Sequence, residues 1–179
     1  ISRQAGDLIR TENPLDVAVT GDAWLSIQGP NGRAYTRDGR MTMTPEGELR
    51  TLTGYQILDV GGAPIQLDPT GGTPGIARDG TLTQGGVQRG ALGLFTIPEQ
   101  ANLTRFENSG VIPDMAAEPA LDFNRVGIMQ GFMEQANVNP VSEISRLIQI
   151  QRSFDSVSNS ITQAEQTLGN AIKTLGETS

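Results

Sequence analysis

A heptad pattern in the last quarter of the chain constrains the fold more than any other feature. From Leu147 onward, apolar residues follow one another at alternating steps of three and four positions, and no proline interrupts them. This spacing places one apolar stripe along an α-helix, as in the seam of a coiled coil. The helix seam consists of Leu147, Ile150, Phe154, Val157, Ile161, Ala164, Leu168, Ala171 and Leu175.

The pattern predicts one long C-terminal helix over residues 139–176. Asn139 suits the N-cap, and Pro140 suits the first helical position, where a missing amide hydrogen costs nothing. At about 1.5 Å per residue the helix would be roughly 54 Å long, more than a domain of this size needs to cover its own core. No second segment of similar length and pattern is present, so the seam needs a partner from elsewhere.

The positions that flank the helix seam are largely uncharged. Such positions usually carry charges in coiled coils, whereas here they are mostly Ser, Thr and Gln. Ile144, Ile148 and Ile172 lie off the seam and widen the apolar surface. We interpret these flanks as suited to a helix that packs against several others in an assembly. An intrachain hairpin with a helix from upstream of Ile1 is the alternative, and both arrangements can hold together.

Composition argues against several classes of function. A chain of 179 residues permits one or two domains with a sizeable core. Its net charge of −7 argues against nucleic acid as the main partner, and no apolar run is long enough for membrane insertion. The lack of cysteine excludes disulfides, and the lack of histidine removes the commonest general base and a common metal ligand. We therefore expect no cofactor, no metal and no catalytic residues.

The segment before the helix predicts a body of short antiparallel strands. Of the 22 glycines, 20 precede Gln135, at turn-like spacing between short alternating runs. Leu15, Val17 and Val19 alternate with other residues and predict a half-buried strand. The predicted fold class is thus a mainly β body plus one long C-terminal α-helix of coiled-coil type. Its expected divisions are a lead-in over 1–13, the β body over 14–125, a connector over 126–138 and the helix over 139–176.

Two stretches of the β body resemble each other. Asp38-Gly39 lies between short alternating runs and predicts a hairpin turn. Arg78-Asp79-Gly80 repeats the preceding Arg37 and the two turn residues. We interpret this echo as two hairpins that use the same turn chemistry rather than as a duplication.

Candidate sites for chemistry are few. The acidic residues are scattered among turns, so no pair of carboxylates is spaced for glycoside hydrolysis, and no glycine-rich loop has the lysine and helix that a phosphate site needs. Trp24 and Tyr35 can stack on a sugar, which makes a glycan-binding module the main alternative function. A single tryptophan in a strand is more typical of the core. We interpret Arg37 and Arg78 as structural or rim contacts.

Several motifs, taken together and in order, resemble bacterial flagellar rod and hook proteins. The first half contains the runs 13–21, 35–39 and 47–49 and the pair Gly54-Tyr55, and the second half contains Gln130-Gly131 and the runs 137–139 and 151–154. One departure is Ala23-Trp24-Leu25, where the family usually has Gly-Phe-Phe. The positions that carry the resemblance most clearly are Leu15, Asp16, Val17, Gly21, Tyr35, Arg37, Asp38, Gly39, Asn137, Asn139, Gln151 and Arg152.

The resemblance implies a structural subunit of the flagellar basal-body rod. Such subunits are exported through the flagellar type III apparatus without signal cleavage and polymerise helically in the periplasm. Their terminal helices form an inner tube with the β bodies outside, and the rod passes motor torque to the hook. The implied partners are other copies of the chain, neighbouring rod proteins and the export apparatus.

Two further expectations rest on the same resemblance. The short body and Asn139-Pro140-Val141 are most similar to proximal rod members, with distal rod members next. Members of the family also begin with a helix that pairs with the C-terminal one. We therefore expect residues 1–13 to lead in from such a helix upstream of Ile1.

Overall fold

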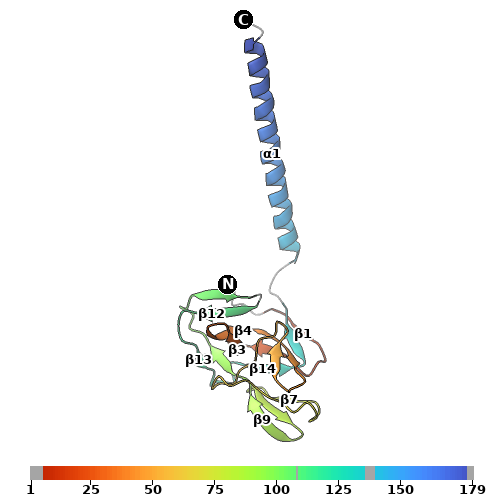
Figure 1. The fold of residues 1–179 in the computed structure, drawn as a ribbon, viewed down its shortest axis with the longest axis vertical. Coiled ribbons are helices and arrows are strands. Elements are labelled where there is room, and N and C mark those ends of the chain that lie inside the picture. Colours follow the sequence, from red (N-terminus) through yellow and green to blue (C-terminus); the bar gives the residue numbers. More distant parts are fainter. Residues whose placement is uncertain (1–5, 108, 136–139, 177–179) are drawn as a thin grey trace. The chain divides into compact units, whose positions relative to one another are not determined.

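A computed structural model describes residues 6–107, 109–135 and 140–176 of the chain; for residues 140–143, 162 and 164–176 it describes the backbone alone. The chain divides into two compact units, Ile1–Asn137 and Val138–Ser179. The first unit consists of short strands and the second contains one helix (Figure 1). This arrangement confirms the predicted fold class.

The described strands of the first unit have two to six residues each, as expected for a body rich in turns. They are β1 (Leu8–Arg10), β2 (Asp16–Thr20), β3 (Trp24–Gly29), β4 (Gly32–Thr36), β5 (Asp38–Met43), β6 (Leu49–Thr51), β7 (Gly75–Ile76), β8 (Thr81–Gln84), β9 (Val87–Ala91), β10 (Leu94–Thr96), β11 (Leu103–Phe106), β12 (Gly110–Pro113), β13 (Glu118–Pro119), β14 (Gly127–Gln130) and β15 (Phe132–Glu134).

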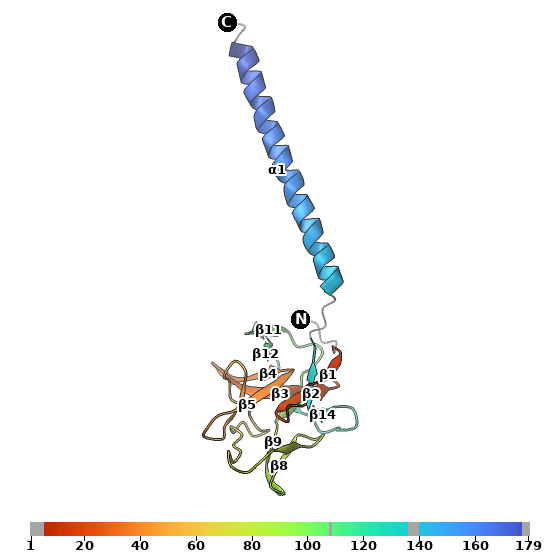
Figure 2. The ribbon, with the colours of Figure 1, turned by 90° about the vertical axis from the view of Figure 1, so that its right-hand side faces the viewer.

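These strands form four sheets in which every named pair is antiparallel. The largest sheet has the order β11-β12-β4-β3-β10-β13, and a second has the order β14-β2-β5-β6. A three-stranded sheet joins β7, β8 and β9, and β1 pairs with β15 in a two-stranded ribbon. Figure 2 shows the red β1 and the cyan β15 side by side.

The six-stranded sheet carries a hydrophobic cluster on each face. Leu25 and Leu94 belong to the larger cluster, whereas their chain neighbours Trp24 and Phe95 belong to the smaller one. This alternation follows from the period of two along a strand. The larger cluster also takes Val17 and Val19 from β2, Met41 from β5 and Ile128 from β14, so it joins both main sheets.

Strand β2 is buried more completely than its pattern predicts. Asp16, Val17, Ala18 and Val19 are all buried, although alternation predicted one exposed face. β15 contacts β2 and β5 without pairing with either of them. The β1–β15 ribbon therefore covers the face that was expected to meet solvent.

The hairpin predicted at Asp38-Gly39 is wrong. Both residues lie inside β5, which pairs with β2 and β6, while the preceding β4 pairs with β3 and β12. The chain thus passes from one sheet to the other at Arg37. Gly39 lies opposite Val17, and a Cβ atom at Gly39 would overlap the Val17 carbonyl. Glycine is required here for close approach of two strands rather than for a turn.

The similar stretch at Asp79-Gly80 is a genuine turn. It lies between β7 and β8, Gly80 has a φ of 87°, and its amide donates to the Ala77 carbonyl at 3.0 Å. That φ is one that glycine adopts readily. The same three letters therefore have different structures at the two places, and the interpretation of the echo as two hairpins does not hold.

The ends of the β unit differ from the expected divisions. The expected connector over 126–138 contains β14, which pairs with β2, and β15, which pairs with β1. The expected lead-in over 1–13 contains β1. The partners of β1 and β14 lie more than 100 positions away in the chain, beyond the reach of a local pattern.

The second unit contains α1 (Pro140–Gly176). It begins at the proline predicted for the first helical position, and its length agrees with the prediction for residues 139–176; Asn139 itself lies outside the described residues. Within the described part of the chain, no helix combines the length and hydropathy that a membrane span requires.

Candidate assembly interface

The described part of the helix seam is exposed to solvent. Five large apolar side chains recur along α1 at the predicted spacing, and more than half of each side chain is accessible, up to 73% for Phe154. They are Leu147, Ile150, Phe154, Val157 and Ile161. The side chains of Ala164, Leu168, Ala171 and Leu175 lie outside the described residues. An apolar stripe of this length is typical of a helix that associates with other helices.

The flanks of the seam are polar, but two of their hydroxyl groups are already hydrogen-bonded within the helix and do not need a partner from a neighbouring helix. Ser153 and Ser160 donate their hydroxyl hydrogens to the carbonyl oxygens of Gln149 and Ser156, at 3.0 and 2.9 Å. Bonds of this kind, to the carbonyl four residues earlier, satisfy the hydroxyl within its own helix. Small side chains with satisfied polar groups let a neighbouring helix approach closely.

Burial of the apolar seam side chains is expected to make the largest favourable contribution to the free energy of association. Each large apolar side chain contributes about 1.5–3 kcal/mol when it moves from water into a packed interface. Gln151 and Arg152, two of the motif residues, are exposed beside and opposite the seam respectively. The seam surface is therefore suited to packing.

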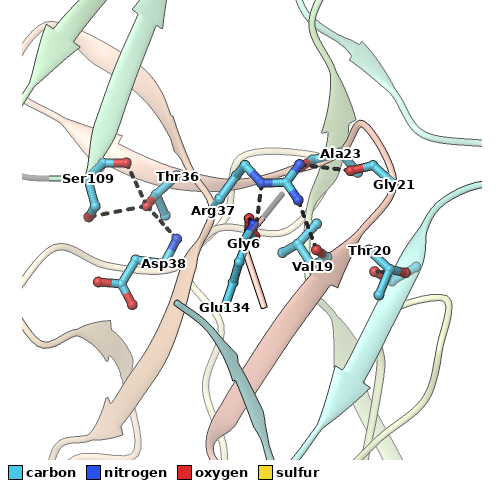
Figure 3. Close-up of polar contacts among 11 residues, drawn as sticks. Gly6, Val19, Thr20, Gly21, Ala23, Thr36, Arg37, Asp38, Ser109 and Glu134 are labelled. Carbon is cyan, nitrogen blue, oxygen red and sulfur yellow. Dashed lines mark hydrogen bonds and ion pairs between the residues drawn. The ribbon is translucent and has the colours of Figure 1, made fainter. Parts of the chain in front are cut away.

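A second cluster of polar contacts lies in the β unit around Arg37 (Figure 3). The Arg37 guanidinium donates to the carbonyl oxygens of Gly21 at 2.8 Å, Val19 at 3.1 Å and Ala23 at 3.3 Å. These carbonyls belong to the end of β2 and the link into β3. Arg37 stands where the chain leaves β4 for β5, so its side chain joins the two main sheets at their crossing point.

Glu134 completes this cluster from β15. One carboxylate oxygen accepts from Arg37 Nε at 3.0 Å, and the other accepts from the Gly6 amide at 2.9 Å. The side chains of Arg37 and Glu134 are only 12% and 11% exposed. The pair is thus enclosed, and both of its charged groups are hydrogen-bonded, which is what burial of charge requires.

The motif Gln130-Gly131 has a comparable structural role. The Gln130 amide nitrogen donates to the carbonyls of Pro14 at 2.8 Å and Pro74 at 2.7 Å, and its oxygen accepts from the Ile76 amide at 3.1 Å. The Gly131 amide donates to the Asp16 carbonyl at 2.8 Å. The Gln130 side chain on β14 therefore binds the segment before β2, the residue before β7 and β7 itself.

Asp38 forms a partly exposed ion pair with Arg40 on β5. Burial alone would raise the pKa of the Asp38 carboxyl, but hydrogen bonds from the Arg40 side chain and amide, together with the Arg40 charge, lower it below its ordinary value. The two Arg40 nitrogens lie 2.7 and 2.8 Å from the carboxylate oxygens. This ion pair is partly exposed on a strand, and outside the sheet ladder the described hydrogen bonds of Asp38 are with Arg40 and Thr36 alone.

The structure gathers the motif residues of the β unit in one region. Leu15, Val17 and Tyr35 contribute to the hydrophobic clusters, and Asp16, Arg37 and Asp38 make the polar contacts near them. Val17 and Gly39 face each other between β2 and β5. Asn137 and Asn139 lie outside the described residues. Nothing in the chain's local pattern marks Glu134, because its partners Arg37 and Gly6 are distant in sequence.

The aromatic and arginine residues considered as candidate binding residues are in the core or bind the backbone of the β unit. Trp24 and Tyr35 are 3% and 6% exposed, and Tyr35 packs edge-to-face on Phe95 with ring centroids 5.4 Å apart. Neither ring is available to a glycan. Arg78 donates to the Asn124 carbonyl at 3.2 Å. Among the described residues, no group of three or more Asp or Glu side chains is placed to hold a metal ion.

Comparison with known proteins agrees with these features. Residues 18–84 match the model of the flagellar hook protein FlgE/F/G D1 domain, and residues 129–174 match that of the flagellar basal body rod FlgEFG protein C-terminal region. The first match covers the crossing point at Arg37, and the second covers the end of β14, all of β15 and most of α1.

Relatives with established names resemble the chain over nine tenths or more of its length. The flagellar basal-body rod protein FlgF of Mesorhizobium japonicum is 45% identical over all 179 residues, which correspond to 74% of that protein. FlgF of Rhizobium meliloti is 47% identical over 98% of the chain and 73% of its own length. The rod protein FlgG of Buchnera aphidicola subsp. Schizaphis graminum is 31% identical over 91% of the chain and 66% of its own length.

Proposed function

Because the chain belongs to the FlgF-type flagellar basal-body rod proteins, and is a structural subunit of the rod, we propose that it polymerises through the helix seam of α1. In this proposal the helices of successive subunits pack side by side into an inner tube, and the β units lie outside it. The subunit occupies the proximal part of the rod.

The observation that carries this proposal is the exposed seam. Phe154 and its four described seam neighbours present apolar side chains to solvent over several turns of α1. The β unit, by contrast, encloses two apolar clusters made of its own residues. A chain that buries the core of one unit and exposes an ordered stripe on the other is suited to assembly.

The partners of a rod subunit are other proteins of the rod and basal body. We propose that here they include further copies of the chain and the flagellar export apparatus, which delivers the subunit to the periplasm without a cleaved signal. Many seam contacts repeated along a tube make it stiff, so that it transmits motor torque to the hook and filament. The lack of cysteine is compatible with export of an unfolded chain.

Two alternatives receive less support. A glycan-binding module would need Trp24 and Tyr35 at the surface, and both are in the core. A distal FlgG-type subunit would be expected to resemble FlgG most, but the FlgF relatives above are 45% and 47% identical whereas FlgG of Buchnera is 31% identical.

The proposal is tested with charges placed on the seam of the full-length protein. Phe154→Asp and Ile161→Asp each put a carboxylate where an apolar contact is required, so we expect rod polymerisation to fail while the β unit stays folded. Asn159→Asp is the matched control, because residue 159 is about 140–160° around the helix from both seam positions. Assembly is followed by electron microscopy and folding by circular dichroism. Normal rods from the two seam variants would refute the proposal.

A further inference from the structure

The β1–β15 ribbon packs on β2 and β5 but is hydrogen-bonded to the main sheets at only a few described points. β1 and β15 pair with each other and with no other strand. The Gly131 amide donates to the Asp16 carbonyl just before β15 begins. At the other end of the strand, the attachment is the side chain of Glu134, which is bound by Arg37. The ribbon is thus fixed at both ends of β15 by contacts of different kinds.

Arg37 is held firmly enough to act as an anchor. Besides Glu134 it binds three backbone carbonyls, those of Val19, Gly21 and Ala23. Its guanidinium carbon also lies 5.8 Å from the centroid of the buried Trp24 ring. Displacement of the guanidinium would break several hydrogen bonds together and leave a charge buried without a partner, which is strongly unfavourable.

Glu134 is also the last strand residue before the helix. β15 ends at Glu134 and α1 begins at Pro140. The chain that leads back from α1 enters the described part of the β unit at the end of β15, where Glu134 is bound. The Gly6 amide donates to the same carboxylate. Glu134 therefore binds residues near both ends of the described part of the β unit.

We propose that the Arg37–Glu134 ion pair is the joint through which α1 passes mechanical load to the β unit. The three-residue ladder between β1 and β15 holds these two strands together but adds little resistance to peeling of the ribbon from the sheets, because neither strand pairs with another described strand. The ion pair resists it by tying β15 to the crossing point of the two main sheets. The role of the ion pair in carrying load rests on the proposed function, whereas its role in fixing the ribbon to the sheets does not.

Amide hydrogen exchange on the full-length protein tests the tie. Glu134→Gln keeps the shape of the side chain and an acceptor for the Gly6 amide but removes the ion pair. We expect the amides of β1 and β15 to exchange about tenfold faster or more, through local opening, with those of β3 and β4 unchanged. Arg37→Met should have the same effect on the ribbon. Arg40→Met, which breaks the exposed pair with Asp38, is the matched control and should leave the ribbon protected.

Motility under load tests the joint. Bacteria that carry Glu134→Gln should assemble normal numbers of rods but stall at a lower viscous load than wild-type or Arg40→Met bacteria. Unchanged exchange in the ribbon would refute the tie, and a loosened ribbon with unchanged stall load would refute the joint. Failure of the proposed function has a different signature, since the seam variants would then polymerise normally whatever the ribbon does.

Discussion

Gly39 lies where two strands approach too closely for any side chain. It pairs with Val17, and an added Cβ would overlap the Val17 carbonyl and press on the Val17 side chain. Both strands belong to the sheet that contributes Met41 and Val19 to the larger cluster. The strands cannot separate without opening that cluster.

Gly39→Ala should therefore destabilise the β unit. We expect the free energy of unfolding to fall by about 1–3 kcal/mol, the usual cost of overpacking, as measured by urea denaturation. Gly90→Ala is the control, because Gly90 also lies in a strand but has open space where a Cβ would be. Its unfolding midpoint should stay close to that of the wild type. Equal midpoints for Gly39→Ala and the wild type would show that the close approach is not required.

Asp38 gives the β unit a specific dependence on pH. Its pKa in the folded state is lowered below 3.8, because the Arg40 hydrogen bonds outweigh the effect of burial. The pair therefore stabilises the fold above the pKa of the unfolded chain, and this contribution is lost as the pH falls through the lowered pKa. Because the side chains are partly exposed, we expect less than about 1 kcal/mol.

The pH effect is isolated by comparison with Asp38→Asn. The difference in the free energy of unfolding between the two proteins should be constant above about pH 5 and should shrink below about pH 4. Asp68, Asp79 and Asp114 also have a lowered pKa, but they are present in both proteins and cancel. A difference that does not change with pH would contradict the account.

At the scale of the elements, the helix could be predicted and the sheet pairing could not. The helix seam repeats every few residues, so the local sequence is sufficient to identify α1 and its start at Pro140. The pairing of β1 with β15 joins residues near the two ends of the β unit, and no local pattern encodes it. The same limit explains why local patterns predict a connector where the structure has β14 and β15.

Strand β5 shows how a strong local signal is overridden. Asp-Gly between alternating runs usually makes a hairpin, but here Asp38 bonds Arg40 and Gly39 fits against Val17. The two runs then join different sheets, with Arg37 between them. Residues 35–39 belong to the run that resembles the flagellar family, but in the structure they form the crossing point of the two sheets and not a turn.

The sequence predicts the apolar seam of the candidate interface but not the Arg37–Glu134 ion pair in the β unit. Arg37 was interpreted as a structural contact, which the structure supports, but its partner was not identified. A single glutamate at position 134 has no signal in the sequence, since its meaning depends on where β15 is placed. Residues that act through distant partners become visible only when the strands are assembled.

For the whole molecule, the two units differ in what they bury. The β unit encloses two apolar clusters, and its few exposed large apolar side chains include single residues such as Leu52 and Leu121. The described seam of α1 encloses nothing of its own. We infer that the β unit folds independently and that the helix reaches its final environment only in the rod.

The most direct test is the structure of the intact basal-body rod by electron cryomicroscopy. The account predicts that α1 of this subunit lies within a layer of helices, with Phe154 and Ile161 buried against neighbouring helices and Arg152 directed away from that contact. The same map should show Arg37 bound to Glu134. Seam side chains that face solvent in the assembled rod would contradict the central claim.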